Sequence, residues 1–470
     1  MYKEKMAVPA YFEVAHHSQE LEVGAGVPIG GYGWGVDRRT NGRVTSPLMV
    51  NCVIIVSPQG RRIALIQVDV ISIPHPVYEQ IRDRMIAHGV VSEAKDLIVA
   101  QSHTHYGPMV GGKPDPEVLL GSPEAVGDTN AYTTKFVDDV VNTAIGAMTK
   151  PLTEVTLGFA EGHAETASSR LDPQLPWGTW APREVPVLVA RRAGDDELFL
   201  VLVGHACHPV CAERMSPDLD ADFCGRLVAD IRQRLGVPAI FFQGATGDVD
   251  PLPAPEGVNR AAFVGKLLAD AVVATVRDAV FSPISGPITT AMETAPLPYA
   301  VNFRDSAEVA ELQQKYQDRV DENDQGEVGQ AGVRHARKML KELADGNRPK
   351  SMPMTVQKID LGGLTILALS HEVLSGYHAS TKLEHPDQRL WIMAYANHVD
   401  CYVPASDVLW AGGHLESGWQ DDPRMVGVGT YSHSYSMLSP LASSPDRSNP
   451  RDERGVEGVV VKYINRVLGN

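Results

Sequence analysis

Residues 51–73, with the sequence NCVIIVSPQGRRIALIQVDVISI, indicate the class of the fold. Two apolar runs, 51–57 and 62–73, flank the turn Pro-Gln-Gly-Arg, and this pattern predicts two buried strands joined by a turn. The segment 76–89 follows with helical spacing of its apolar residues and a terminal glycine, which predicts a helix. This order indicates a domain that mixes sheet and helix.

The same alternation continues along the chain. Apolar runs predict strands within 96–102, 197–209 and 237–251, and amphipathic segments predict helices over 133–150, 222–236 and 257–280. After Pro283 we expect a strand near 287–299, helices over 306–320 and 332–346, paired strands within 353–370, a long loop over 429–450 and a helix over 455–469. The predicted fold class is α/β, with mixed sheets, flanking helices and functional loops at strand ends. We expect one large domain over 1–470, or alternatively two packed halves, about 1–283 and 284–470.

Composition limits the classes of partner. The chain has 470 residues and a formal net charge of −16, which argues against nucleic acid and anionic membranes as partners. It has no run of about 18 apolar residues and no secretory signal pattern at its first residues. Five scattered cysteines indicate a reducing compartment, so we expect a cytoplasmic protein. The partner that we expect is a small-molecule substrate. The sequence is also compatible with a homo-oligomer.

Two histidines, His103 and His105, follow the apolar run 97–99 in the sequence AQSHTHYGP. In an extended chain, side chains two residues apart point to the same face, so these two rings would lean together where the strand ends. Neutral imidazole is a common zinc ligand and also transfers protons near neutral pH. Taken alone, the pair favours the simpler interpretation, two histidines bonded to backbone carbonyls in a loop, because a zinc site needs three or four convergent ligands.

Three more strand ends carry candidate ligands. His208 follows an apolar strand and precedes a proline, Glu372 stands beside His371 after the run 366–369, and the segment 396–404 carries His398, Asp400 and Tyr402. Each of these residues alone is typical of an ordinary loop. Four such groups after apolar strands in one acidic chain are harder to explain by ordinary loops alone, and they are candidates for the three or four ligands that a zinc site needs. We expect His16, His17, His163 and His433 to lie at the surface instead.

The loop FQGATGDVDP, residues 242–251, combines two glycines with two carboxylates. Gly247 allows a tight turn, and Asp248 and Asp250 follow at alternate positions before a proline. Such a loop is typical either of a turn that precedes a helix or of the lining of a site. A tryptophan pair, Trp177 and Trp180, is a further candidate for a substrate-binding surface.

Several of these motifs occur together in a known family. SHTHYGP resembles the histidine motif of the neutral/alkaline ceramidases, which are zinc-dependent amidases; CHPV resembles their His-Pro motif, and QGATGDVDP is similar to their Gly-Asp-Val-Ser-Pro loop. The segment 40–56 resembles the start of their first strand. The likeness extends from about Gly24 to Gly418 and implies a ceramidase-like catalytic domain without the family's C-terminal accessory domain.

The resemblance implies a role for each matching residue. His103, His208 and Glu372 would bind one Zn²⁺, and Tyr402 would complete the set, although another register puts Val399 at that position. His105 would transfer a proton or bind substrate, and Arg170 would polarise a carbonyl group. Gly247 and Asp248 of the matching loop would contact substrate. Trp177 and Trp180 lie outside these motifs, and as aromatic side chains they would either line a substrate pocket or cover the core. The sequence departs from the family at Asp250, which replaces a serine, and at Ser-His-Glu, which replaces Pro-Gly-Glu.

The function that follows is zinc-dependent hydrolysis by metal-activated water. We expect cleavage of a C–N amide bond, or of an ester, in a small polar soluble substrate, with Asp250 or His105 as the general base. A carboxylate at 250 would also suit a substrate amine or a second cation. Two alternatives stay open at this point: an N-acylsphingosine (ceramide) amidohydrolase, and a metal-binding relative without catalytic activity.

Overall fold

The computed structural model describes residues 11–31, 38–111, 118, 120–323, 327–412, 431–434 and 436–469. The predicted strand pair is present as β3 (Met49–Val56) and β4 (Arg62–Val68), which are antiparallel with Val53 opposite Leu65. β4 ends five residues earlier than expected, because the chain leaves the sheet after Val68 to form a loop toward α1 (His75–Ala87). Gly418, where the family resemblance ends, lies outside the described residues.

The first sheet is nine-stranded and mixed, in the order β11-β9-β8-β6-β1-β3-β4-β5, with β13 paired to β6. Its remaining strands are β1 (Phe12–Glu20), β5 (Leu97–Gln101), β6 (Thr153–His163), β8 (Glu184–Arg192), β9 (Leu198–His205), β11 (Ala239–Gln243) and β13 (Ser282–Ile284). Apolar side chains of α1 and α3 (Pro123–Thr149) cover one part of its outer face, and α4 (Asp222–Leu235) and α5 (Arg260–Asp278) cover another. α4 ends as expected at Gly236, whose φ is +73°.

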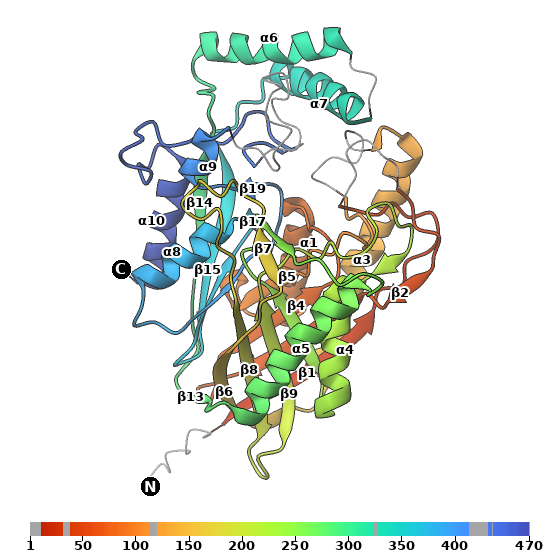
Figure 1. Ribbon diagram of the computed structural model, residues 1–470, viewed down its shortest axis with the longest axis vertical. Helices are drawn as coiled ribbons and strands as arrows, with labels where there is room; N and C mark the ends of the chain where they lie inside the picture. The colour runs from red at the N-terminus through yellow and green to blue at the C-terminus, as the bar shows by residue number, and fades with distance from the viewer. Residues whose placement is uncertain are drawn as a thin grey trace.

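A second sheet of four strands, in the order β14-β15-β16-β18, packs on the inner face of the first. Its strands are β14 (Thr289–Pro298), β15 (Ser351–Asp360), β16 (Thr365–Leu369) and β18 (Leu390–Met393). Its other face packs against α8 (Ser375–Glu384) and α10 (Val456–Leu468). The molecule is therefore layered as helices, sheet, sheet and helices (Figure 1), and the predicted α/β class with mixed sheets is confirmed.

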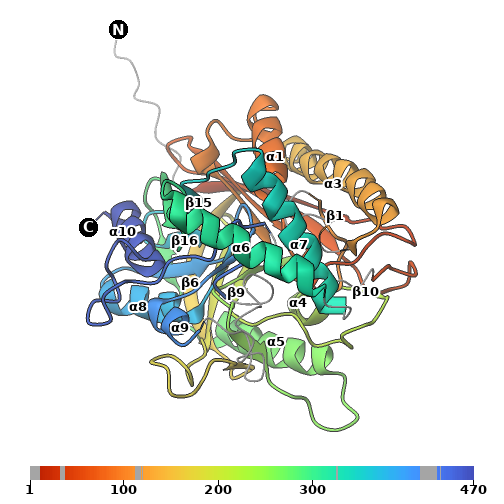
Figure 2. The same cartoon turned by 90° about the horizontal axis from the view of Figure 1, so that it is seen from above.

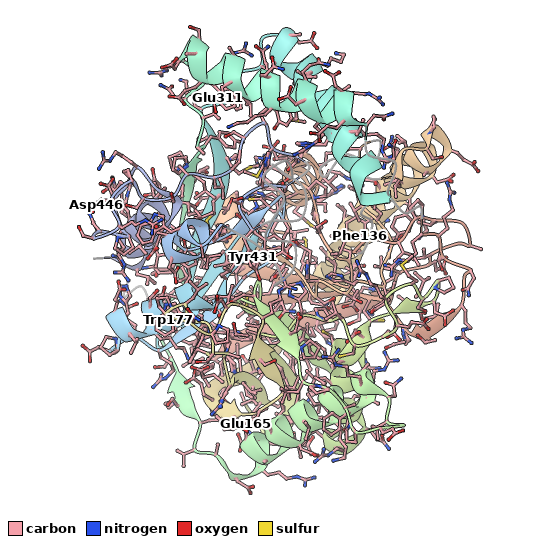
Figure 3. All side chains as sticks on the ribbon, turned by 45° about the horizontal axis from the view of Figure 1, so that its top comes forward. Phe136, Glu165, Trp177, Glu311, Tyr431 and Asp446 are labelled. Carbon is pink, nitrogen blue, oxygen red and sulfur yellow. The ribbon has the colours of Figure 1, made fainter. Side chains whose placement is uncertain are left out.

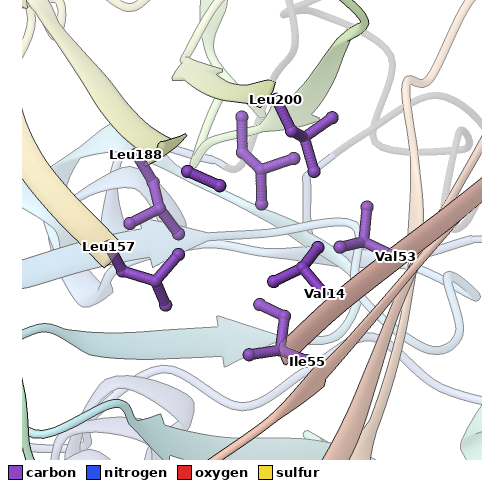
Figure 4. Close-up of a pocket in the computed structure, with 8 residues that line it drawn as sticks. Val14, Val53, Ile55, Leu157, Leu188 and Leu200 are labelled. Atoms are coloured by element: carbon purple, nitrogen blue, oxygen red, sulfur yellow. The ribbon is translucent and has the colours of Figure 1, made fainter. Parts of the chain in front are cut away.

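The space between the sheets is filled by apolar side chains. Branched residues of the first sheet, such as Val14, Ile55, Leu188 and Leu200, surround an internal cavity of about 10 Å³ (Figure 4). A cavity of this size is no larger than one water molecule. The lining of this cavity is apolar, and the core packs the two sheets against each other.

The ends of β5, β9 and β11 lie close together, although β5 and β11 are at opposite ends of the strand order of the first sheet. Gln243, the last residue of β11, donates from its side-chain amide to the carbonyls of Ser102 and Cys207, which follow β5 and β9. The first sheet must therefore curl until β5 and β11 approach each other. This closure brings the loops after β5, β9 and β11 to one place.

A helical hairpin of α6 (Ser306–Glu322) and α7 (Glu327–Ala344) lies at the top of the molecule in Figure 1 and crosses the middle of the view from above in Figure 2. Arg334 of α7 donates to the carbonyl of Val118, and Tyr316 of α6 donates to the carbonyl of Leu438. Short elements complete the fold: β2 (Val44–Ser46), β7 (Ala167–Ser169), β10 (Leu219–Asp220), β12 (Val249–Pro251), β17 (Glu372–Val373), β19 (Tyr402–Val403), α9 (Ser406–Trp410) and the 3₁₀ turn η1 (Ala94–Asp96).

All five cysteines are free. Among the described helices, none combines the length and the apolar character needed to cross a bilayer.

Candidate metal centre

His103 follows β5 in a turn and not in an extended strand. The strand ends at Gln101, and His103 has a left-handed backbone with φ +65°, which is uncommon for a residue with a β-carbon. The expectation that His103 and His105 lean together along a strand is therefore wrong in its geometry. The two rings still meet, with 3.4 Å between their Nε2 atoms, because the turn directs both toward the same point.

Side chains from three distant segments converge at that point. The Nε2 atoms of His103 and His208 are 3.0 Å apart, and Oε2 of Glu372 lies 3.2 Å from the first and 3.8 Å from the second. Both histidine side chains are 1% exposed and that of Glu372 is 15% exposed. The structure thus brings together the three residues for which the sequence predicts metal binding.

The hydrogen bonds of the Nδ1 atoms of His103 and His208 indicate whether these two residues and Glu372 can bind a metal ion. Nδ1 of His103 lies 2.7 Å from the carbonyl of Ile71, and Nδ1 of His208 lies 2.8 Å from that of Thr246. A carbonyl only accepts, so each Nδ1 carries the proton and each neutral ring turns the lone pair of Nε2 inward. Two lone pairs and a carboxylate so close together repel one another unless a cation lies among them. Their separations also suit zinc, since Zn–N bonds of about 2.0–2.1 Å place tetrahedral ligands about 3.4 Å apart.

His105 lies at the edge of the same group. Burial, together with the neighbouring His103 and Arg38, holds the pKa of His105 well below its usual range. The ring is therefore neutral near pH 7 and has a lone pair for a metal ion, while its lowered pKa makes it a weaker base than an exposed histidine. Its nitrogen also lies within 4.8 Å of those of His103 and His208, so the geometry suits either a third imidazole ligand or a proton acceptor.

The predicted tyrosine ligand, Tyr402, has another partner. Its hydroxyl accepts a hydrogen bond of 3.2 Å from Arg170, and its ring packs at 5.1 Å against Tyr431. Tyr395 instead reaches the centre: its hydroxyl is 3.4 Å from Oε2 of Glu372, and its ring centroid is 4.3 Å from that of His103. Tyr395 is absent from the predicted ligands, although it follows β18 by two residues, much as the predicted ligands follow their strands.

Arg170 links the surroundings of the centre. It donates to the hydroxyl of Tyr431 at 3.0 Å and to the carbonyl of Gly247, and it pairs with Asp250 at 3.4 Å. Its side chain is 17% exposed, whereas that of Asp250 is 34% exposed. The carboxylate of Asp250 is thus both held by a cation and open to a ligand. Tyr431, near the centre of the molecule in Figure 3, was also missed, since its loop carries no recognisable motif.

The loop after β11 holds neighbouring segments together. Gly247 donates to the carbonyl of Val373 at 3.0 Å, and a β-carbon on it would lie 2.9 Å from the carbonyl of Glu372. Asp248 is fully buried, and its carboxylate accepts from the amide and the hydroxyl of Ser375 at 2.6 and 2.8 Å. Both residues therefore support β17 and α8, and their expected contact with substrate stays a prediction.

The two tryptophans lie beside α8. Trp177 covers Gly376, where a β-carbon would be 2.8 Å from its Cδ1, and the ring of Trp180 lies 5.8 Å from that of His378. Trp180 also lines an open surface cavity of about 430 Å³ with Arg183 and Glu184. The structure is compatible with a ligand surface here.

His433 is buried, with 3% of its surface exposed. The expectation that it lies at the surface is therefore wrong. Its Nε2 lies 3.0 Å from the carbonyl of Met437, and its ring packs at 5.4 Å against His335 of α7.

Comparison with known proteins supports the fold. No protein-family profile and no curated protein sequence matches the chain. Among solved structures, it is similar to a neutral ceramidase from Pseudomonas aeruginosa, with a TM-score of 0.65 and 15% identity over 87% of this chain and 71% of that chain. It is also similar to a ceramidase complexed with C2, with a TM-score of 0.63 and 14% identity over 85% and 70% of the respective chains. Similarity at such low identity shows that the fold is ceramidase-like.

Proposed function

We propose that this protein is a zinc-dependent hydrolase that cleaves an amide bond, or an ester, in a small polar substrate. The observation that carries the proposal is the convergence of His103, His208 and Glu372, with both Nδ1 atoms bonded to carbonyls. The ceramidase-like fold supports it, because the two similar structures are of amide-cleaving enzymes by name. The nitrogens and the carboxylate that converge here form one set of inward-facing donors, which suits one zinc ion per chain.

A bound zinc ion would supply Lewis acidity, which activates water as a nucleophile near neutral pH. The residues around it would handle protons and orient the substrate. Asp250, which is partly exposed and paired with Arg170, suits the role of general base, and neutral His105 suits either proton uptake or metal binding. Because Arg170 already bonds to Tyr431, Gly247 and Asp250, we assign it the task of holding Asp250 and Tyr402 in place.

The polarity of the site favours a polar substrate. A carboxylate, a guanidinium group and the hydroxyls of Tyr402 and Tyr431 gather beside the metal centre. Desolvating such groups against a purely apolar chain is costly unless the ligand replaces their hydrogen bonds. The formal net charge of −16 further disfavours an anionic membrane surface as the place of work.

The test is a hydrolysis screen of zinc-loaded protein against polar N-acyl compounds, their ester analogues and N-acylsphingosines. We expect turnover of a polar amide that is lost when the metal is chelated and recovered when zinc is added back. Selective cleavage of N-acylsphingosine would favour the ceramide amidohydrolase instead, an alternative that rests on the similar structures. Stoichiometric zinc with no hydrolysis across the panel would favour a metal-binding relative without catalytic activity.

A further inference from the structure

A second histidine cluster lies behind the metal centre. His371, His398 and Asp400 are 0%, 1% and 5% exposed, and their ligand-type atoms lie within 4.8 Å of one another. Nδ1 of His398 is 2.9 Å from the carboxylate of Asp400, and Nε2 of His398 is 3.1 Å from the hydroxyl of Thr355. No part of the proposed hydrolysis uses these groups.

The hydrogen bonds of His371 indicate a structural link in place of metal binding. Its Nε2 lies 2.9 Å from the carbonyl of Pro353 and must carry the proton, because a carbonyl only accepts. Its Nδ1 therefore has a lone pair, and that lone pair accepts a hydrogen bond of 3.1 Å from the backbone amide of Asp400. Both nitrogens of the ring are thus already bonded within the protein.

His371 is also held in a costly backbone conformation directly before Glu372. Its φ is +71°, in the left-handed region that a residue with a β-carbon seldom adopts. Backbone bonds join this segment to the one after β18: the amide of His371 donates to His398 at 2.9 Å, and that of Glu372 donates to Cys401 at 2.9 Å. A strained backbone conformation persists only where surrounding contacts hold it. Here these backbone hydrogen bonds hold His371, and the conformation of His371 sets the direction of Glu372, the next residue.

The same cluster reaches the loop that orients His103. The backbone amide of His75 donates to Asp400 at 3.3 Å, and the amide of Val399 donates to the carbonyl of Ile73 at 2.9 Å. Two residues earlier, the carbonyl of Ile71 accepts the proton on Nδ1 of His103. One buried network therefore connects the supports of two predicted ligands that are 269 positions apart (372 − 103).

We infer that His371, His398 and Asp400 are positioning residues, which fix Glu372 and His103 relative to each other for binding of the metal ion. The inference rests on the proposed metal centre and goes beyond it, since it assigns the affinity of that centre partly to residues that do not touch the ion. Residues that orient metal ligands typically contribute roughly 10- to 100-fold to metal affinity.

The test measures zinc affinity by competition with a chromophoric chelator and measures the unfolding temperature of the metal-free chain. H371G removes the ring but accepts the left-handed backbone without strain, so the variant can fold. We expect it to weaken zinc binding roughly 10- to 100-fold, and D400N to do the same. H371N, which tolerates the backbone and keeps an acceptor for the amide of Asp400, should restore part of the affinity.

The matched control is H385N, which alters a buried histidine bonded to Asn465 at the end of α8. It should lower the unfolding temperature without changing zinc affinity. Unchanged zinc affinity in both H371G and D400N would overturn the inference, and so would a second equivalent of zinc in the wild type that H371G loses. A zinc-loaded wild type that hydrolyses nothing would instead refute the proposed function and leave the inference standing.

Discussion

The Nε2 atoms of His103 and His208 lie 3.0 Å apart, although the two residues are 105 positions apart in the chain. Each ring turns its other nitrogen to a backbone carbonyl, at Ile71 and at Thr246. The loop after β5 and the loop after β9 therefore hold two lone pairs against each other. Such an arrangement is stable when a cation lies between the rings, and the predictions on metal binding follow from this.

Replacing either histidine should abolish tight zinc binding. In H103A or H208A one of the few inward-facing donors is lost, so we expect zinc affinity to fall by more than the roughly 100-fold that a supporting residue contributes. Chelator competition and elemental analysis measure this loss. H163A, at an exposed histidine, is the control and should bind zinc as the wild type does. Full zinc occupancy in H208A would contradict the assignment.

Asp250 and Asp248 should respond differently to the same substitution. D250N removes a partly exposed carboxylate beside Arg170, so we expect turnover to fall roughly 10²- to 10⁴-fold, as for loss of a general base, with zinc content unchanged. D248N disturbs a buried acceptor of two hydrogen bonds from Ser375, so it should lower the free energy of unfolding by about 1–3 kcal/mol. Steady-state kinetics and urea unfolding separate the two effects. If D250N and D248N lost the same turnover and had the same free energy of unfolding, this division of roles would be wrong.

The sequence predicts the parts of the centre that follow long buried strands. Leu97–Gln101 and Leu198–His205 have continuous apolar runs, so the ends of both strands, and with them His103 and His208, could be located from local pattern alone. The start of α3 could also have been found, since Ser122 accepts from the amide of Ala125 and precedes a proline, which are ordinary signals of a helix start. The helix predicted from the sequence begins ten residues later, at 133.

Tyr395 and the link between His371 and Asp400 could not be predicted in this way. Their roles depend on the pairing of Glu372 with Tyr402 in two-residue strands, which are too short to have a periodic pattern. The left-handed turn at His103 is likewise imposed by its tertiary contacts, among them the hydrogen bond from its amide to the carbonyl of Val70. The local sequence pattern is enough to predict where a strand ends. Which distant loops lie close together depends on the curl of the first sheet, which the local pattern does not predict.

Gly247 should not tolerate a side chain. In G247A the new β-carbon would lie 2.9 Å from the carbonyl of Glu372 and 3.0 Å from Cδ1 of Leu374, so β17 must move. We expect a loss of about 1–3 kcal/mol in unfolding free energy, as for other overpacked sites, together with weaker zinc binding. G257A is a control at a turn where a β-carbon meets nothing within 4 Å, although its φ of +76° makes some loss of stability expected there too. Zinc affinity should fall in G247A and stay unchanged in G257A. Unchanged zinc affinity in G247A would show that the loop after β11 does not support the metal centre.

His205 should make the protein less stable in mild acid. Burial lowers its pKa to about 4, and its ring accepts from Thr166 at 2.7 Å and donates to the carbonyl of Glu184 at 3.1 Å. The unfolded chain takes up this proton near pH 6.5, well before the folded chain does, so acid favours unfolding between about pH 6.5 and pH 4. The difference between the pKa of His205 in the unfolded chain and in the folded chain corresponds to about 2–3 kcal/mol of unfolding free energy lost between about pH 7.5 and pH 4.5.

The measurement is urea unfolding of the metal-free chain at both pH values, for the wild type and for H205Q. Glutamine offers an amide without titrating, so H205Q should be less stable than the wild type at about pH 7.5 and should lose about 2–3 kcal/mol less on acidification. Other titrating groups act on both chains alike, which is why the difference between them isolates His205. If the two chains lose the same stability between these pH values, His205 is not held neutral by burial in the folded protein.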